Sequence, residues 1–504
     1  MFKGKVKFKL FIGENAAPVT DAKIIIFDID NNEPLILGPF VPNENGESEE
    51  ILLDTIDKEL SLKPISLVVP YKTYNAIILS NKYENVFIKN FQIFNDVVSI
   101  QGIRMRAKIK GKDEFKIVDI PPNGLLQSPV EQKTVENMPI TNPNPKVLTK
   151  PIVPRYITIH LGSPKVYARD IKVLFTDYIK NVASSEIYPT WPENAIRANI
   201  IAQISFTLNR IYTEWYRSRG YNFDITNSTA YDHYFVEGRN IFENISRIVD
   251  GIFNDYISRI EFLEPLLAQY CNGTTVTCEG LSQWGTVDYA NAGLIPFEIL
   301  EKYYGSNIEI RDGIIVDDNI GSYKGVLLRR GSSGNDVRVI QNQLNRIRQN
   351  YPGIPQISKD EIDTKYFGNT TESAVKTFQK VFSLLSDGIV GKNTWYKISQ
   401  IYVGVKKLAE LESEGEANSM IPPYPGYYIK YGSKGEIVKN IQTSIHVISS
   451  KYPSIPSLDV DGAFGSKTKA AIKAFQKYFG LASDGIVGPK TWEKLYEVYF
   501  EAIN

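Results

Sequence analysis

The sequence predicts a multidomain α+β protein, and three observations lead to this expectation. The chain has 504 residues, more than one hydrophobic core normally supports. Apolar and polar residues alternate near the N-terminus, a pattern typical of strands. Apolar residues then recur at three- and four-residue spacing in the middle of the chain, and residues 325–400 and 427–497 repeat one helical pattern. We therefore expect an N-terminal β domain, an α+β middle domain and two helical modules.

The composition excludes several classes of protein. Hydrophobic residues make up 43% of the chain and charged residues 23%, as in ordinary globular proteins. Lys and Arg together number 57, as do Asp and Glu, so no net charge draws the chain to nucleic acid or to an anionic membrane. No apolar run approaches the ~18 residues of a membrane-spanning helix, so we expect no membrane insertion. The N-terminus lacks the apolar core and cleavage site of a secretory signal peptide.

Residues 1–108 are expected to form an antiparallel β-sandwich. Val6, Phe8 and Leu10 alternate with polar residues, and further runs rich in Val and Ile are separated by turn residues. The stretch APVTDAKIIIFDID followed by NENG resembles the transthyretin-like or carboxypeptidase-regulatory sandwich. That resemblance implies a small module with no chemistry of its own, and this part of the sequence has no catalytic constellation.

Residues 109–154 are rich in proline and are expected to be extended and exposed, because proline interrupts both helices and sheet ladders. Exposed extended chain is a good protease substrate. The segment is therefore either a passive linker or an activation site. Its one internal apolar pair, Leu125 and Leu126, is followed by Gln127 and Ser128, and we place the cut near these two residues.

Residues 155–312 begin with a short strand and continue into two helices separated by a break. The first helix is predicted from apolar residues at helical spacing and ends in Glu186; Pro189 and Pro192 then interrupt the chain. The apolar residues of this first helix are Ile171, Leu174, Phe175, Tyr178, Ile179 and Val182. A carboxyl group at such a break lies close to apolar packing, which raises its pKa and suits it to general acid catalysis. The alternative is a solvated carboxylate at a helix end.

Two stretches of this region resemble one known family. They are YIKNVASSEIYPTWPENAIRANIIAQISFTLN at 178–209 and CEGLSQWG at 278–285, which is followed by YYG at 303–305. They resemble the start and end of the domain shared by stage II sporulation protein D and the amidase enhancer LytB. The resemblance implies an α+β catalytic domain with Glu186 as its acid. Many relatives carry a longer stretch with a Gly-His-Gly-type run before SQWG, which this chain lacks.

Five further residues are candidates for substrate binding in this domain. Aromatic faces stack on sugar rings and carboxylates bind hydroxyl groups, although aromatic loops also serve packing. The candidates are Tyr231, Asp232, His233, Gln283 and Trp284.

Cys271 and Cys278 are the only cysteines of the chain, so a disulfide framework is excluded. The pair could be free thiols, one bridge or half of a metal site. A structural zinc needs four close ligands, and His160 and His233 would have to be the other two. We expect no cofactor, with zinc at this pair as the one candidate.

The repeated segments at 325–400 and 427–497 share paired Gly, Gln, Phe and Trp positions. The pattern resembles the three-helix peptidoglycan-binding domain type 1, which implies two long helices and a short one. Phe378, Trp395, Phe475 and Trp492 are expected in the cores. Residues 401–426 form a tether, so two weak sites could combine on a polymer.

The order of these parts resembles that of the clostridial spore cortex-lytic enzymes. The resemblance implies a zymogen in the spore cortex or coat, made in the mother cell, that a subtilisin-like protease activates during germination. Its partner would be cortex peptidoglycan. We expect lytic transglycosylation between N-acetylmuramic acid and N-acetylglucosamine, in which Glu186 acts alone and a 1,6-anhydro ring forms, because ordinary hydrolysis needs a second carboxylate.

Other functions stay open at this point. An N-acetylmuramoyl-L-alanine amidase, alone or as an additional activity, usually needs zinc, and the chain has only three histidines. A non-catalytic amidase enhancer or wall-binding scaffold, or a phage tail or lysin component, would carry the same binding modules.

Overall fold

The computed structural model describes residues 2–13, 15–28, 35–64, 68–108, 115–126, 148, 150–275, 278–315, 323, 325–413 and 428–503. The chain forms two compact units, Met1–Val405 and Lys406–Asn504. The N-terminal β domain, the middle domain and the first helical module all belong to the first unit. Within the described ranges, no helix is both long enough and apolar enough to cross a membrane.

The N-terminal domain consists of two sheets around one hydrophobic core. One sheet has the order β4 (Leu35–Phe40), β3 (Ala22–Asp28), β6 (Lys72–Ser80), β7 (Asn85–Ile93) and β9 (Phe115–Asp119). The other has the order β14 (Ile241–Phe242), β8 (Val98–Arg104), β1 (Phe2–Ile12) and β2 (Ala17–Pro18), with β5 (Ile51–Thr55) also paired to β1. Val6, Phe8 and Leu10 are buried in this core, as their alternation predicts.

Two expectations for this domain are corrected. The sandwich is not purely antiparallel, since β1 pairs with β8, and β7 with β9, in parallel. It also extends beyond residue 108, because β9 completes one sheet and β14 of the middle domain completes the other. A strand contributed from distant sequence cannot be recognised from local alternation alone.

The middle domain is built around helices α1 (Phe175–Glu186) and α2 (Glu193–Tyr212), with α3 (Glu243–Ile252), α4 (Gln283–Asn291) and α5 (Pro296–Tyr304) around them. The larger of its sheets has the order β12 (Asp170–Leu174), β11 (Tyr156–His160) and β13 (Ile225–Thr226). Two-stranded pairs are β10 (Ile152–Val153) with β19 (Ile314–Ile315), β15 (Asp255–Arg259) with β18 (Ile308–Asp312), and β16 (Tyr270–Cys271) with β17 (Leu281–Ser282).

The first helix of this domain is shorter than the sequence predicts. Ile171 and Leu174 lie on strand β12, which pairs antiparallel with β11, and the helix begins at Phe175. Apolar side chains at Ile171, Val173 and Leu174 fit either a strand or a helix, and the pairing with β11 decides the outcome.

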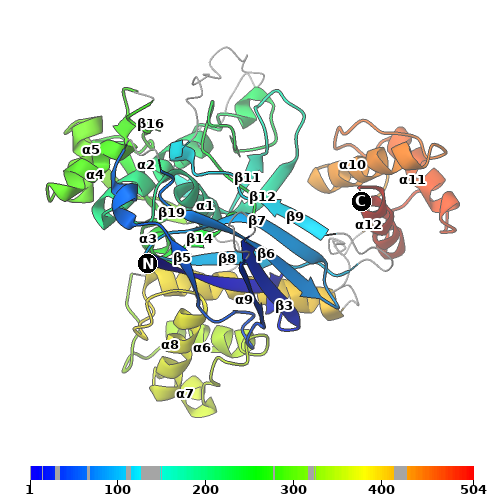
Figure 1. Ribbon diagram of the computed structural model, residues 1–504. Coiled ribbons are helices and arrows are strands. Elements are labelled where there is room, and N and C mark those ends of the chain that lie inside the picture. Colours follow the sequence, from blue (N-terminus) through cyan, green and yellow to red (C-terminus); the bar gives the residue numbers. More distant parts are fainter. Residues whose placement is uncertain are drawn as a thin grey trace. The chain divides into compact units, whose positions relative to one another are not determined.

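The N-terminal domain and the middle domain share hydrophobic packing. Phe94, at the end of β7, is fully buried in the core of the middle domain, with its ring centroid 5.5 Å from that of Tyr188 and 5.1 Å from that of Phe242. Helix α3 packs against β8. Figure 1 shows the blue strands of the N-terminal domain close to α1, α3 and β14 of the middle domain.

Each helical module contains three long helices rather than two long and one short. The first has α6 (Asn335–Ile347), α8 (Asn369–Val381) and α9 (Lys392–Ser413), plus the short α7 (Lys359–Asp363); α9 continues into the predicted tether. The second has α10 (Glu436–Lys451), α11 (Ser466–Tyr478) and α12 (Pro489–Ile503). The four predicted core aromatics, Phe378, Trp395, Phe475 and Trp492, are buried.

Candidate active site

Glu186 is the last residue of α1, and local sequence places it there. Ile187 has an extended backbone conformation, and Pro189 and Pro192 prevent the helix from continuing. The residue is only 7% exposed, so its carboxyl group is enclosed by the protein rather than set at an open cleft edge.

The carboxyl group of Glu186 accepts three hydrogen bonds from well-separated parts of the chain. The backbone N–H of Tyr234 donates to Oε1 at 2.7 Å. The amide of Gln203 donates to Oε2 at 2.8 Å, and the Tyr270 hydroxyl donates to the same oxygen at 2.5 Å. The carboxyl group is therefore fixed in orientation by α2, by the 231–234 loop and by β16.

Burial raises the pKa of Glu186 to about 7, because desolvation penalises the charged form. The hydrogen bonds from Tyr234, Tyr270 and Gln203 oppose this shift, since they stabilise the carboxylate. Burial and the nearby Glu186 also raise the pKa of Tyr270, which keeps its hydroxyl protonated as a donor. A carboxyl group with this pKa exists in both protonation states near neutral pH, as a general acid and base requires.

His233 lies in this site as a buried neutral ring. Its Nδ1 is 3.0 Å from the Tyr178 hydroxyl, and its ring centroid is 5.6 Å from that of Tyr270 and 4.7 Å from that of Phe206. Burial lowers the pKa of His233 to about 3, so the ring is uncharged at neutral pH. His233 is buried among Tyr178, Phe206 and Tyr270, of which Tyr270 also contacts Glu186.

Asp232 has an internal role that differs from the sugar binding we expected. Its Oδ1 accepts from Arg210 Nε at 3.0 Å, and its Oδ2 accepts from the Tyr216 hydroxyl at 2.6 Å. The backbone N–H and the hydroxyl of Thr226 donate to Oδ2 as well. Both oxygens are thus occupied by protein donors, which explains how a buried carboxylate is tolerated here.

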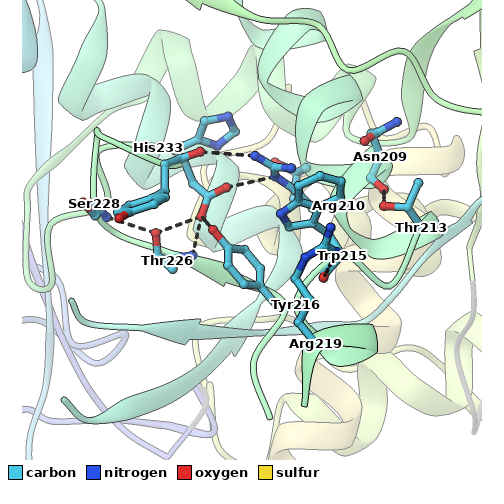
Figure 2. A network of polar contacts seen from close by, with 12 residues as sticks. Asn209, Arg210, Thr213, Trp215, Tyr216, Arg219, Thr226, Ser228 and His233 are labelled. Atoms are coloured by element: carbon cyan, nitrogen blue, oxygen red, sulfur yellow. Dashed lines mark hydrogen bonds and ion pairs between the residues drawn. The ribbon is translucent and has the colours of Figure 1, made fainter. Parts of the chain in front are cut away.

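The network around Asp232 fixes the loop that binds Glu186. The carbonyl of Tyr231 accepts from Arg210 Nη2, and the Arg210 guanidinium lies 4.7 Å from the Trp215 ring centroid. Figure 2 shows Arg210 between Trp215, Tyr216 and the loop that carries His233. Because Tyr234 follows two residues after Asp232, this anchoring determines where its N–H points. Tyr231 and Asp232 therefore hold the loop through Arg210 and do not themselves contact the carboxyl group of Glu186.

Gln283 contacts the backbone of Glu186, and Trp284 packs with aromatic residues that follow Glu186 in the chain. The amide of Gln283 donates to the Glu186 carbonyl at 3.4 Å. Trp284 belongs to an aromatic cluster, with its ring centroid 4.8 Å from that of Trp191 and 5.9 Å from that of Tyr188. All three rings are buried.

Cys271 and Cys278 form a disulfide, which resolves the three possibilities that the sequence leaves open. The bridge occupies both sulfur atoms, so the pair does not offer thiolates to a metal in this state. His160 is engaged elsewhere, with Nδ1 2.7 Å from Asp170 Oδ1 and Nε2 3.0 Å from the Val166 carbonyl. In the described parts of the chain, no group of three or more His, Cys, Asp or Glu residues is arranged to hold a metal ion.

The sequence reasoning missed Gln203, Tyr270 and the N–H of Tyr234. Gln203 is the polar residue inside the apolar run IIAQIS, and a polar residue at a buried helix position is a signal that could have drawn attention to it. Tyr270 precedes Cys271, but nothing local indicates that the disulfide-linked loop approaches α1.

The end of the N-terminal domain covers Glu186, and we call its residues Asn123 and Gly124 the strap. The amide of Asn123 donates to the carbonyls of Ser184 and Ile187, and its backbone N–H donates to the Tyr71 hydroxyl. A Cβ added at Gly124 would lie 3.3 Å from the Ser185 carbonyl oxygen and 3.7 Å from Glu186 Cα. The predicted cut near Gln127 and Ser128 lies just beyond this strap, outside the described residues.

A second part of the N-terminal domain covers the aromatic cluster. The Trp191 indole N–H donates to the Ser61 carbonyl at 2.9 Å, and the hydroxyls of Ser61 and Thr190 are 2.6 Å apart. Both contacts join the 310 turn Lys58–Leu62 to the segment directly after Glu186. The catalytic candidate is thus enclosed from the side of the N-terminal domain.

A protein-family match falls on each of the two helical modules. Residues 333–398 and 434–495 match the family described as "Putative peptidoglycan binding domain". Peptidoglycan is therefore supported as the partner of these two segments.

Curated relatives of this chain include proteins named as amidases and one named as a carboxypeptidase. The chain is 33% identical over 177 residues to a "Probable N-acetylmuramoyl-L-alanine amidase" of Bacillus licheniformis, covering 34% of this chain and 46% of the relative. It is 44% identical over 68 residues to the "Zinc D-Ala-D-Ala carboxypeptidase" of Streptomyces albus G, covering 13% of this chain and 25% of the relative. The chain spans less than half the length of these relatives, which support a cell-wall-degrading enzyme in general terms only.

Among solved structures, the chain is similar to "The crystal structure of SleB N-terminal domain". The identity is 34%, the match covers 15% of this chain and 99% of that chain, and the TM-score is 0.14.

Proposed function

We propose that this chain is a peptidoglycan lytic transglycosylase in which Glu186 is both the acid and the base. The observation that carries the proposal is the environment of its carboxyl group, which is buried, has a pKa of about 7 and is held by an amide, a phenol and a backbone N–H. A single carboxyl group with these partners can give up a proton and take one back. Hydrolysis by the usual route requires a second carboxyl group at a set separation, whereas transglycosylation takes its nucleophile from the substrate.

In this mechanism, protonated Glu186 donates its proton to the glycosidic oxygen between N-acetylmuramic acid and N-acetylglucosamine. The bond from that oxygen to the muramic C1 breaks, and the N-acetylglucosamine leaves as an alcohol. The Glu186 carboxylate then removes the proton of the muramic C6 hydroxyl, whose oxygen bonds to C1. The product is a 1,6-anhydro ring, and Glu186 ends protonated as it began.

The neighbouring residues orient the carboxyl group for these two transfers. Tyr270 and Gln203 both donate to Oε2, and Tyr234 N–H donates to Oε1. They stabilise the carboxylate that remains after the first transfer, so they lower the cost of forming it inside a buried site.

We also propose that the N-terminal domain keeps the enzyme inactive until it is cut away. The support is steric, because Asn123 and Gly124 pack on the backbone of residues 184–187, and Ser61 contacts Trp191 just after Glu186. A subtilisin-like protease that cuts near Gln127 would separate this strap from the middle domain in sequence. The setting we propose is the cortex of a germinating spore.

An amidase is the second candidate, because the relatives bear that name. An amidase would cut the bond between the muramic lactyl group and L-alanine and would leave glycan strands intact. A wall-binding scaffold without activity would release neither product.

Mass spectrometry of fragments released from purified cortex separates these functions. The samples are the intact chain, the chain cut in its 127–147 segment, and the cut chain with Glu186→Gln. Glu193→Gln is a matched control, because Glu193 is an exposed glutamate at the start of α2. We expect 1,6-anhydromuramic ends only from the cut chain and from the cut control. Free L-alanine amino groups on stem peptides would instead support the amidase, reducing ends would indicate a hydrolase, and no release would support the scaffold.

A further inference from the structure

One surface position of the repeat differs in exposure between the two binding modules. In the first module this face consists of Tyr351, Val381 and Phe382; in the second, the aligned residues are Tyr452, Tyr478 and Phe479. We call these sets the first and second module faces. Each lies where the end of the second long helix of its module meets the loop that follows the first long helix.

The first module face is covered by the N-terminal domain. The Tyr351 hydroxyl donates to the Asn15 carbonyl at 2.7 Å, and Lys9 Nζ donates to the Val381 carbonyl at 2.6 Å. The same Nζ lies 4.7 Å from the centroid of the Phe382 ring. Tyr351, Val381 and Phe382 are consequently buried.

The second module face consists of one exposed ring, Tyr478, and two half-buried rings, Tyr452 and Phe479. The three rings contact one another, with centroids 5.2 Å apart for Tyr452 and Tyr478, 5.3 Å for Tyr452 and Phe479, and 4.9 Å for Tyr478 and Phe479. Tyr478 is 53% exposed, whereas the aligned Val381 is 4% exposed. Lys494 Nζ lies 5.6 Å from the Phe479 ring centroid and adds a positive charge beside the rings.

The second module differs from the first at two positions that lie against the N-terminal domain in the first module. Gly353 of the first module lies so close to that domain that an added Cβ would be 2.5 Å from Glu44 Oε1. The second module has Ser454 at this position, and it has the larger Tyr478 in place of Val381. The two modules therefore present different side chains at the same place in the repeat.

We propose that the second module face binds the glycan strand of peptidoglycan. Sugar rings would stack on Tyr478, beside Tyr452 and Phe479. Aromatic rings supply large apolar surfaces with polar edges, which suits the faces and hydroxyls of sugars. Contiguous exposed apolar surface marks binding sites in general. The matched family segment 434–495 contains all three rings and Lys494. The N-terminal domain occupies the corresponding face of the first module, so the second module makes this contact in the intact chain.

The proposal is tested by retention on insoluble peptidoglycan, with Glu186→Gln present in every sample so that no digestion occurs. We expect Tyr478→Val, which installs the first module's residue, to weaken binding about tenfold, as for loss of an aromatic anchor. Tyr478→Phe keeps the ring and should bind within about threefold of the parent. Tyr431→Ala is the matched control, because Tyr431 is a comparably exposed tyrosine of the same module, at 63%. The proposal is wrong if Tyr478→Val binds like the parent, or if Tyr431→Ala weakens binding equally.

A second measurement needs no substitution at the face. Hydroxyl-radical labelling of the Glu186→Gln chain, with and without peptidoglycan, reports the exposure of each tyrosine. We expect peptidoglycan to protect Tyr478 and to leave Tyr431 reactive. Unchanged labelling of Tyr478 would overturn the proposal, as would protection that depends on protein concentration and appears without peptidoglycan, which would identify a second copy of the chain as the occupant. Neither readout depends on the reaction at Glu186, so failure here leaves the transglycosylase proposal untouched.

Discussion

Two glutamates in different domains have similarly small exposed fractions, yet their surroundings move their pKa values in opposite directions. Glu186 in the middle domain is 7% exposed and Glu361 in the first binding module is 9% exposed. Burial raises the pKa of Glu186 to about 7. Burial also acts to raise the pKa of Glu361, but hydrogen bonds from Thr371 and Thr370 outweigh it, and the pKa lies below its usual value.

The difference comes from the kind of donor that each carboxyl group meets. Glu361 accepts from the N–H groups of Gly368, Thr370 and Thr371, at the positive N-terminal end of α8, and from the Thr371 hydroxyl. Glu186 receives one backbone N–H and two side-chain donors, without a helix N-terminus. Burial alone therefore does not make a reactive carboxyl group. The depth at which the carboxyl group lies and its donors together decide the pKa, and Glu186 lies deeper in the protein than Glu361.

The largest expected effect is on turnover. Glu186→Gln removes the transferable proton, and we expect turnover on cortex to fall by at least ~100-fold while retention on peptidoglycan is unchanged. The measurement is the rate of fragment release by the chain cut in its linker. Glu361→Gln, the same chemical change at the other buried glutamate, should leave this rate within about twofold, and equal losses in the two variants would end the distinction we draw.

The second effect is on stability, and here we expect Glu361→Gln to be the more affected variant. Glu361→Gln places an amide NH2 against backbone donors, so we expect the first module to lose about 1–3 kcal/mol of stability. Glu186→Gln avoids the desolvation of a charge, and its new NH2 can face Gln203 and the Tyr270 hydroxyl, which can both turn to accept, so it should cost less stability at neutral pH. Thermal unfolding followed by circular dichroism compares the two variants. A destabilised Glu186→Gln chain beside an unaffected Glu361→Gln chain would contradict the assignment of roles.

The third effect is a dependence of stability on pH. Glu186 has a pKa near 7 in the folded chain and 4.5 as its ordinary value, so the folded state holds the extra proton between these values. Stability should therefore fall as pH rises from about 4.5 to about 7, and by roughly 3 kcal/mol at most. Glu361 has the opposite sign, because its folded pKa is lowered: its contribution is present above pH 4.5 and lost on acidification. Urea unfolding of the parent and of each Gln variant across this range isolates each contribution by difference.

The smallest effect concerns Tyr270. Tyr270→Phe removes one donor that stabilises the Glu186 carboxylate, so the pKa of Glu186 should rise further. The high-pH limb of the turnover profile should then move upward by a fraction of a pH unit, with a modest loss of rate at the optimum. Tyr304→Phe is a control, because the Tyr304 hydroxyl donates to the Gln269 carbonyl and not to Glu186. A profile identical to that of the parent would exclude Tyr270 from control of the carboxyl group.

Local sequence was sufficient wherever a property depends on residues close together in the chain. The alternation at Val6, Phe8 and Leu10 gave the buried face of a strand, and the spacing around Phe378 and Trp395 gave the core of a helical module. The break at Pro189 placed Glu186 at a helix end. These features follow from backbone periodicity and from the geometry of proline, which act over a few residues.

Tertiary structure alone decided the features that make Glu186 reactive or keep it closed. Its donors Gln203, Tyr234 and Tyr270 lie 17, 48 and 84 residues away in sequence, and each reaches the carboxyl group from a different element. The strap at Asn123 and the strand β14 cross between parts of the chain that the sequence suggested were separate domains. Hydrogen bonding and desolvation depend on distance in space, and a pattern read along the chain does not contain that distance. The sequence thus determined which carboxyl group stands at the helix break, and only the folded chain determined its donors, its pKa and its cover.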